Sequence, residues 1–336
     1  MIEQRPPRAS ARRHLLAALL FSLLGMGVAL AAPTPALAQP PAQDGSMLYL
    51  PEIMNQACKV NLTPNLMGAQ IYDGTGSGSI FHQPLVNSGA TWVRISVSWA
   101  AVEPTNTTPD QYHWGNADSQ VVMAYERCWP IVLTIGSNPA WASTHKEGFL
   151  DKAGPDELAQ FTAALAERYD GDGIQDAPGS PKVLYFEMYN EPDVGALSLD
   201  ERWGDAPAQY AAMLKAVYPA VKAANPKAQV VFGGIAFDFF TDQDPVHPEN
   251  NGPFVRTFFE NVLKNGGGPY FDIMNYHFYP LFGPNWAKNF PKDGPGLVEK
   301  TEAVRAIMRR YNISKPVIIT EAGWHNNSTI PYGDDT

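Results

Sequence analysis

Short apolar runs that alternate with amphipathic stretches dominate the pattern of hydrophobic and polar positions along the chain. Several of these runs are apolar almost throughout, which is typical of strands that are covered on both faces. We therefore predict seven β-strands, at Met67–Tyr72, Thr91–Val97, Pro130–Ile135, Val183–Met188, Gln229–Ile235, Phe271–Phe278 and Pro316–Thr320.

Helical periodicity occupies the segments between the runs. Apolar residues recur at helical spacing over 158–169 and 304–311, and a third helix is expected over Ala206–Ala224 with a kink at Pro219. Strands that alternate with helices at this spacing form a parallel sheet, and the chain has no glycine-rich phosphate loop. The pattern therefore predicts an α/β fold of the (β/α)8 TIM-barrel class rather than a doubly wound sheet.

The N-terminal residues have the features of an export signal. Several arginines precede an apolar run over 15–32, and the small-residue sequence Ala36-Leu37-Ala38 follows it. Because the run is close to membrane-spanning length, an uncleaved anchor is the alternative. We expect a signal peptide over 1–38, a linker leading into the barrel over 39–60 and the barrel over 61–336. The mature protein would then be secreted or periplasmic, or held at the cell surface, without being embedded in a membrane.

Composition and charge exclude several classes of function. Hydrophobic residues make up 45% of the chain and charged residues 17%, so a large core can be buried and disorder is excluded. The net charge of −10 argues against a nucleic-acid partner, because such proteins carry basic stripes. The two cysteines lack zinc-site spacing. We expect no metal and no cofactor, and a monomer.

Polar and aromatic side chains follow the predicted strands at their carboxyl ends, where TIM-barrel active sites lie. The strand ends contribute Arg94, Asn190, Glu191, His277, Tyr279 and Glu321, together with Trp141 and Trp324. Two carboxylic acids on opposite strands suit glycosidic bond cleavage, in which one donates a proton and the other attacks the anomeric carbon. Aromatic rings add flat apolar faces for sugars. The predicted partner is therefore an oligosaccharide or polysaccharide.

Four sequence motifs carry a resemblance to a known group of enzymes. The segment Tyr185–Asp193 (YFEMYNEPD) is similar to the Asn-Glu-Pro motif of clan A glycoside hydrolases, and Val317–Trp324 (VIITEAGW) resembles their strand-seven motif. Trp92–Ile95 (WVRI) and His277–Pro280 (HFYP) are similar to two further motifs of the clan, and the four occur in the clan's order. Families 39 and 5 are the most similar.

The resemblance implies a role for each candidate residue. Glu191 would be the general acid/base and Glu321 the nucleophile of a retaining mechanism, while Asn190 would bond the sugar 2-hydroxyl. Arg94 and Tyr279 would hold Glu321 ionised and oriented. His277 would lie beside the site as a hydrogen-bond partner, with a satisfied core histidine as the alternative.

Two further aromatic residues and one further acid complete the interpretation. Trp324 and Trp141 would be sugar platforms, with plain packing as the alternative for Trp141. Glu187 lies deeper in the barrel, and we expect a buried structural carboxylate paired with Arg94 rather than a catalytic one.

Loop lengths bear on the mode of action. Phe237–Pro253 and Leu281–Pro295 are long segments that follow the fifth and sixth predicted strands. Long loops at this end of a barrel favour an extended groove, and therefore an endo-acting enzyme.

The clan pattern is incomplete at the C-terminal end of the sequence. No eighth strand is evident after Trp324, so the barrel is expected to be truncated after strand seven, with its C-terminal part missing and open edges at strands one and seven. Separately, Cys58 and Cys128 are both expected at the N-terminal face of the barrel, and export permits a disulfide between them.

Two other functions remain possible on the sequence. The first is a non-catalytic carbohydrate-binding protein on the same barrel, which would not need both Glu191 and Glu321. The second is a metal-dependent barrel hydrolase that uses His277, His325 and Glu321, but the chain lacks a ligand cluster at metal spacing. Insensitivity to EDTA would separate the predicted glycosidase from the metal-dependent hydrolase.

Overall fold

The computed structural model describes residues 67–71, 82–195, 202–237, 254–279 and 297–323. All of them belong to one compact unit, Asp44–Thr336. The predicted signal peptide and linker lie outside these residues, as do Cys58, Trp324 and the segment where an eighth strand would follow. Both long loops also lie outside them, apart from Phe237.

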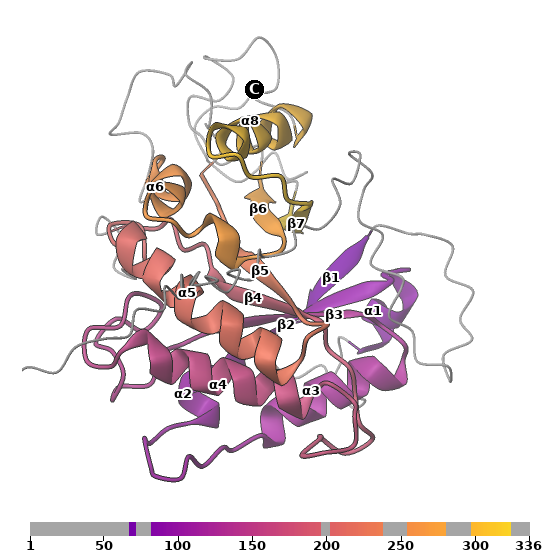
Figure 1. The fold of residues 1–336 in the computed structure, drawn as a ribbon. Helices are drawn as coiled ribbons and strands as arrows, with labels where there is room; N and C mark the ends of the chain where they lie inside the picture. Colours follow the sequence, from indigo (N-terminus) through magenta and orange to yellow (C-terminus); the bar gives the residue numbers. More distant parts are fainter. Residues whose placement is uncertain (1–66, 72–81, 196–201, 238–253, 280–296, 324–336) are drawn as a thin grey trace, which may run out of the picture. The chain divides into compact units, whose positions relative to one another are not determined.

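Parallel strands in sequence order form the framework that carries the site (Figure 1). A five-stranded parallel sheet consists of β1 (Gly68–Ile71), β2 (Trp92–Ser98), β3 (Ile131–Gly136), β4 (Tyr185–Asn190) and β5 (Gln229–Gly234). A second parallel pair consists of β6 (Met274–Phe278) and β7 (Val317–Ala322). Two isolated parallel bridges, Val231 to Ile273 and Ile235 to Tyr276, connect β5 to the β6 segment.

Strands β3 to β6 are buried along almost their whole length, as the continuous apolar runs predicted, whereas β1 and β7 are partly exposed. In β3, every residue from Ile131 to Ile135 is buried. One face packs into the main core with the helices, while Trp92, Val132, Tyr185, Val231 and Ile273 form a second apolar cluster. Burial on both faces explains why these strands lack the alternation of polar and apolar positions that a half-exposed sheet shows.

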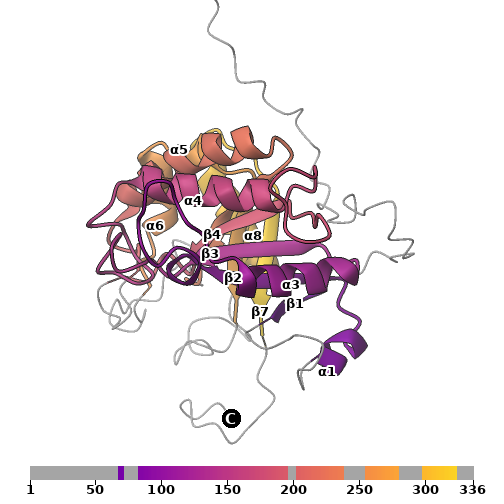
Figure 2. The same cartoon turned by 90° about the horizontal axis from the view of Figure 1, so that it is seen from below.

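Helices connect the strands and cover the sheet (Figures 1 and 2). They are α1 (His82–Asn87), α2 (Trp99–Val102), α3 (Gly115–Glu126), α4 (Pro155–Arg168), α5 (Pro207–Ala224), α6 (Phe258–Lys264) and α8 (Leu297–Arg310). Pro155 opens α4 after Gly154, and acidic residues in its first turn and Arg168 in its last complement the helix dipole. α4 and α5 pack against each other. Among the described residues, no helix is both long enough and apolar enough to span a membrane.

All seven predicted strands are present, and their boundaries shift by a few residues. The largest shift is in β6, which begins at Met274 rather than Phe271 because a 3-10 turn over Gly268–Tyr270 precedes it. The predicted third helix is α5, with Pro219 inside it.

Candidate active site

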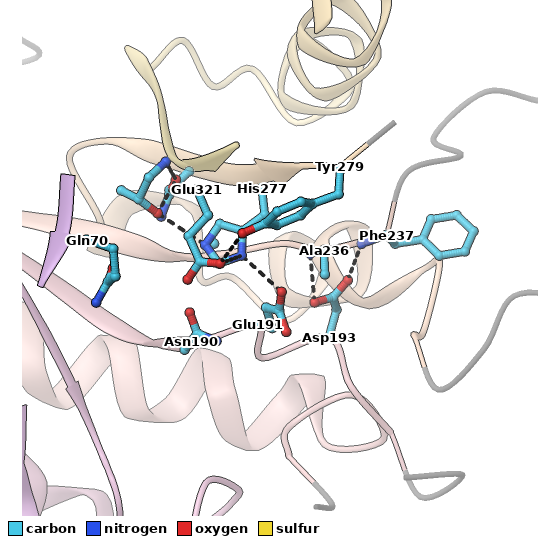
Figure 3. A network of polar contacts seen from close by, with 12 residues as sticks. Gln70, Asn190, Glu191, Asp193, Ala236, Phe237, His277, Tyr279 and Glu321 are labelled. Atoms are coloured by element: carbon cyan, nitrogen blue, oxygen red, sulfur yellow. Dashed lines mark hydrogen bonds and ion pairs between the residues drawn. The ribbon is translucent and has the colours of Figure 1, made fainter. Parts of the chain in front are cut away.

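Strands β2, β4, β6 and β7 bring the predicted site residues together in one hydrogen-bonded network, part of which is drawn in Figure 3. Arg94 lies within β2, Asn190 ends β4 and Glu191 follows it. His277 lies in β6 and Glu321 in β7. A register irregularity between Tyr276 and His277 pairs His277 with Glu321 across the two strands.

Arg94 is the centre of the network. Its side chain is 2% exposed, and its Nε and Nη2 atoms donate to the two oxygens of Glu187 at 2.6 and 2.9 Å. The remaining three N–H groups donate to Gln70 Oε1 at 2.8 Å, Asn190 Oδ1 at 2.8 Å and Glu321 Oε1 at 2.5 Å. All five donors of the guanidinium are therefore used, and its orientation is fully determined.

Glu187 is the buried counter-charge of Arg94. It also accepts hydrogen bonds from the Thr134 hydroxyl at 2.7 Å and the Asn275 amide at 2.8 Å. Burial acts to raise the pKa of Glu187, but the adjacent Arg94 guanidinium outweighs this and lowers it. The structure therefore confirms the predicted pairing of this buried carboxylate with Arg94.

Both oxygens of Glu321 have fixed partners. Arg94 holds Oε1, and the Tyr279 hydroxyl donates to Oε2 at 2.9 Å. The side chain is 14% exposed, so it reaches the solvent while its charge stays compensated. This carboxylate is oriented by one buried and one partly buried group, as the resemblance implied.

Glu191 has a different set of partners. His277 Nδ1 lies 3.1 Å from its Oε1, and Arg202 Nη1 lies 3.2 Å from its Oε2. Burial acts to raise the pKa of Glu191, but the hydrogen bond and charge of His277, with the charge of Arg202, lower it. Its backbone φ is 45°, in the left-handed region that non-glycine residues rarely adopt.

His277 lies between the two carboxylates and is 1% exposed. Its Nδ1 is 3.6 Å from Glu321 Oε2, and its Nε2 is 3.2 Å from the Thr320 hydroxyl. Gly234 in β5 leaves the space for this ring, because a Cβ at that position would lie 2.1 Å from His277 Nε2. His277 is thus held within the site, as expected.

The spacing of the three side chains bears on metal binding as well as on catalysis. One ligand atom each of Glu191, His277 and Glu321 lies within 4.8 Å of the others. However, Arg94 and Arg202 contact the two carboxylates, and these positive charges oppose a bound cation. We therefore assign no metal to this set. Asp170, Asp172 and Asp176 form a second acidic group of similar spacing on a loop after α4.

Asp193 lies beside Glu191 and supports that side of the site (Figure 3). It is fully buried and accepts hydrogen bonds from the backbone N–H groups of Ala236 at 3.1 Å and Phe237 at 2.8 Å. Burial raises the pKa of Asp193 to about 6. These bonds fasten the turn after Glu191 to the end of β5.

The remaining predicted residues lie outside the network or outside the described residues. Trp141 packs edge-on against the buried Trp99 with ring centroids 5.2 Å apart, and its indole N–H donates to the Glu103 carbonyl at 3.0 Å. Its role as a sugar platform stays a prediction. Trp324 is not described. The Cys58–Cys128 disulfide also stays a prediction, because Cys58 is not described.

Several members of the network were not identified from the sequence. Gln70 and Thr134 are polar residues inside otherwise apolar strands, and that contrast is a signal that could have found them. Arg202 precedes α5 in a segment with no distinctive pattern. Nothing in the sequence therefore indicated that its side chain contacts Asn190 at the end of β4.

Comparison with known proteins connects this geometry to a family. Residues 63–336 match the cellulase family, glycosyl hydrolase family 5. Among solved structures, a glucosidase from Croceicoccus marinus is similar with 18% identity and a TM-score of 0.54, over 79% of this chain and 53% of that one. A fungal beta-1,4-galactanase is similar with 15% identity and a TM-score of 0.51, over 80% of this chain and 77% of that one.

The similarity to these two structures, at 18% and 15% identity, extends to the fold alone. The chain spans about half the length of the glucosidase that it matches. No curated protein sequence matches it. The family match and the two structures confirm the predicted (β/α)8 barrel class and the resemblance to clan A.

Proposed function

The chain belongs to glycosyl hydrolase family 5, and from this premise we propose that it is a secreted retaining glycosidase that cleaves β-linked glycans within the polymer. Glu321 is the nucleophile and Glu191 the general acid/base in this proposal. The substrate is an oligosaccharide or polysaccharide.

The distance between the two carboxylates carries the proposal. An oxygen of Glu191 lies within 4.8 Å of an oxygen of Glu321. Retaining enzymes place their carboxyl groups about 5–5.5 Å apart, whereas inverting enzymes leave about 6.5–9.5 Å for a water molecule. The shorter spacing leaves no room for a water between the second carboxylate and the sugar ring, so that carboxylate attacks the anomeric carbon directly.

The first chemical step depends on the fixed orientation of Glu321. Arg94 and Tyr279 hold its two oxygens, so an oxygen is presented to the anomeric carbon while the charge stays compensated. The attack forms a glycosyl-enzyme ester at Glu321. Because Asn190 Oδ1 accepts from Arg94, the amide N–H2 group is the part of this side chain that donates to the sugar 2-hydroxyl.

Glu191 acts in both steps. It donates a proton to the leaving oxygen in the first step and removes one from the attacking water in the second. His277 and Arg202 favour its ionised form, so its proton-donating form becomes scarce as the pH rises. The proposal therefore includes an activity that falls on the alkaline side.

The test is hydrolysis of a defined panel of polysaccharides, comprising β-glucans, xylans, mannans, β-1,4-galactan and bacterial exopolysaccharides. We expect new reducing ends, oligosaccharides of several lengths early in the reaction, and retained anomeric configuration by proton NMR of the first product. EDTA should leave the rate unchanged. Binding without hydrolysis would instead identify a non-catalytic carbohydrate-binding protein, and inverted configuration would reject the two-step mechanism.

Secretion is tested separately, because it depends on the first 38 residues rather than on the site. Expression of the full chain in a bacterial host should give extracellular or periplasmic protein that begins at Gln39. Retention of residues 1–38 in the membrane fraction would contradict the predicted cleavage.

A further inference from the structure

Arg202 makes two contacts at the end of β4, and one of them, to the backbone, has no part in the proposed chemistry. It precedes α5, and its Nη1 atom donates both to the Asn190 carbonyl at 2.9 Å and to Glu191 Oε2 at 3.2 Å. Its side chain is 18% exposed and that of Glu191 is 21% exposed. One guanidinium group therefore holds the proposed acid/base by its side chain and by the peptide bond that precedes it.

The second of these contacts acts on an unusual stretch of backbone. Tyr189 and Glu191 have φ angles of 64° and 45°, both in the left-handed region. Such a conformation costs non-glycine residues roughly 1–2 kcal/mol and persists where surrounding contacts stabilise it. The orientation of the peptide between Asn190 and Glu191 defines the φ angle of Glu191, and Arg202 bonds the carbonyl oxygen of that peptide.

On the basis of the proposed function, we propose that Arg202 is a positioning residue for the acid/base. It keeps the left-handed turn at Glu191 in place and directs the Glu191 carboxylate toward His277. It acts through Glu191 and does not need to contact the sugar.

The charges around Glu191 come from several elements. Arg202 contacts it from the segment before α5 and His277 from β6, while Arg94 in β2 adds a more distant positive charge. Glu321 in β7 lies beyond His277, and Asp193 is buried two residues along the chain. Arg94 also holds Glu187 and Glu321, so removing its charge would disturb the buried part of the network. Arg202 takes part in neither of those two ion pairs, and it is therefore the positive charge chosen for removal.

The chain offers a matched control for this removal. Arg168 at the end of α4 forms an ion pair with Asp118, and both of these side chains are 17% exposed. It resembles Arg202 in charge, burial and partner type, but it contacts none of the site residues among its described partners. Arg168→Gln therefore shows how the loss of a largely buried, ion-paired arginine affects the protein when the site itself is not touched.

The first measurement needs no substrate. The side-chain carboxyl carbons of glutamate are labelled with 13C, the Glu191 signal is assigned by its loss in Glu191→Gln, and its titration is followed by NMR. We expect the titration of Glu191 to move to higher pH in Arg202→Gln, to return toward the wild-type position in Arg202→Lys, and to stay unchanged in Arg168→Gln.

The second measurement is the pH profile of kcat/KM on an unactivated β-glycan. We expect Arg202→Gln to lose about 10-fold at the optimum, less than the 10²–10⁴-fold that general acid catalysis itself supplies. Its alkaline limb should also move to higher pH. A role in folding alone would lower the rate at every pH without moving that limb.

The role of Arg202 and the glycosidase activity can each fail without the other. An unmoved Glu191 titration and an unmoved alkaline limb in folded Arg202→Gln would overturn the role of Arg202, whatever the wild-type activity. A moved titration in a protein that hydrolyses no glycan would support the role of Arg202 and reject the glycosidase. Equal shifts in Arg202→Gln and Arg168→Gln would also overturn it, because they would reflect the net charge of the chain.

Discussion

The two carboxylates of the site are held in different ways, although their oxygens lie within 4.8 Å. Glu321 is attached to a buried network, because its partner Arg94 is 2% exposed and also holds Glu187, which is fully buried. Glu191 follows the end of β4 in a strained turn, and its partner Arg202 is partly exposed. Glu321 is thus tied to the buried pair of Arg94 and Glu187, whereas Glu191 has one buried partner, His277, and one partly exposed partner, Arg202.

This difference suits the two proposed roles. A nucleophile must keep one protonation state and one direction, and a saturated network of charge-assisted hydrogen bonds provides both. An acid/base must change its protonation twice in each cycle, which is easier beside groups that water can reach. The comparison predicts that changes on the Glu321 side cost activity and stability together, whereas changes on the Glu191 side mainly alter pH dependence and substrate range.

The largest expected effect is on the nucleophile. Glu321→Ala should lower kcat by at least about 10⁴-fold on every substrate, because no other group can form the glycosyl-enzyme. The measurement is hydrolysis of both polymeric and activated aryl glycosides. Glu302→Ala on the exposed surface of α8 is the control, and it should retain wild-type activity.

The next effect tests the acid/base assignment. Glu191→Ala should lower kcat/KM by about 10²–10⁴-fold on unactivated glycans but only slightly on substrates whose leaving group needs no protonation. The comparison uses kcat/KM, because this parameter reports the first chemical step. Equal losses on both kinds of substrate would mean that the two roles have been assigned to the wrong residues.

The third effect concerns stability on the Glu321 side. Arg94→Met should lower the free energy of unfolding by about 3–5 kcal/mol, because it leaves the buried Glu187 charge without its partner. Adding Glu187→Leu should restore part of that loss, and chemical denaturation followed by circular dichroism measures both variants. Arg202→Met on the other side should cost only about 1 kcal/mol or less. Equal losses for the two arginine variants would show that Arg94 and Arg202 contribute alike to the stability of the fold.

The fourth effect is a pH dependence on the Glu191 side. Burial raises the pKa of Asp193 from 3.8 to about 6, so the folded state binds this proton more tightly than the unfolded state does. The resulting stability is fully present below about pH 4 and is lost as the pH rises through 6, a change of about 3 kcal/mol. Urea unfolding between pH 4 and 7 should show this slope in the wild type.

Asp193→Asn provides the comparison for that slope. The variant lacks the titrating group, so its stability should vary less with pH over the same range. Glu187 should add no slope of this sign there, because its pKa is lowered rather than raised. A wild type and a variant with parallel profiles would show that Asp193 does not titrate in this range.

Sequence patterns predicted the strands of the fold better than they predicted the residues that hold the two carboxylates in place. Long apolar runs identified all seven strands, because burial on both faces leaves a continuous signal. Short helices such as α1, α2 and α6 were not predicted, since four to seven residues carry too little periodicity. Strand ends identified Arg94, His277 and Glu321 because polar residues there follow apolar runs.

The missed residues show why the rest could not be predicted. Thr134 contributes through a hydroxyl that meets Glu187 only when β3 and β4 pair in the observed register. Arg202 contacts Glu191 because the chain turns back after β4, and nothing in the local sequence specifies that return. Trp141 illustrates the converse, because an aromatic residue after a strand also serves to pack against Trp99. Contacts that depend on the tertiary path need the structure.

The five bonds of Arg94 also determine when the site forms during folding. They join Arg94 to Gln70, 24 positions away, and to Glu321, 227 positions away. Closing a loop of that length is slow compared with forming α4 or α5, because the entropy of the intervening chain must be lost before the contact stabilises it. Regain of activity after dilution from denaturant should therefore lag behind regain of the helical signal, and hydrolysis would report the last step of assembly.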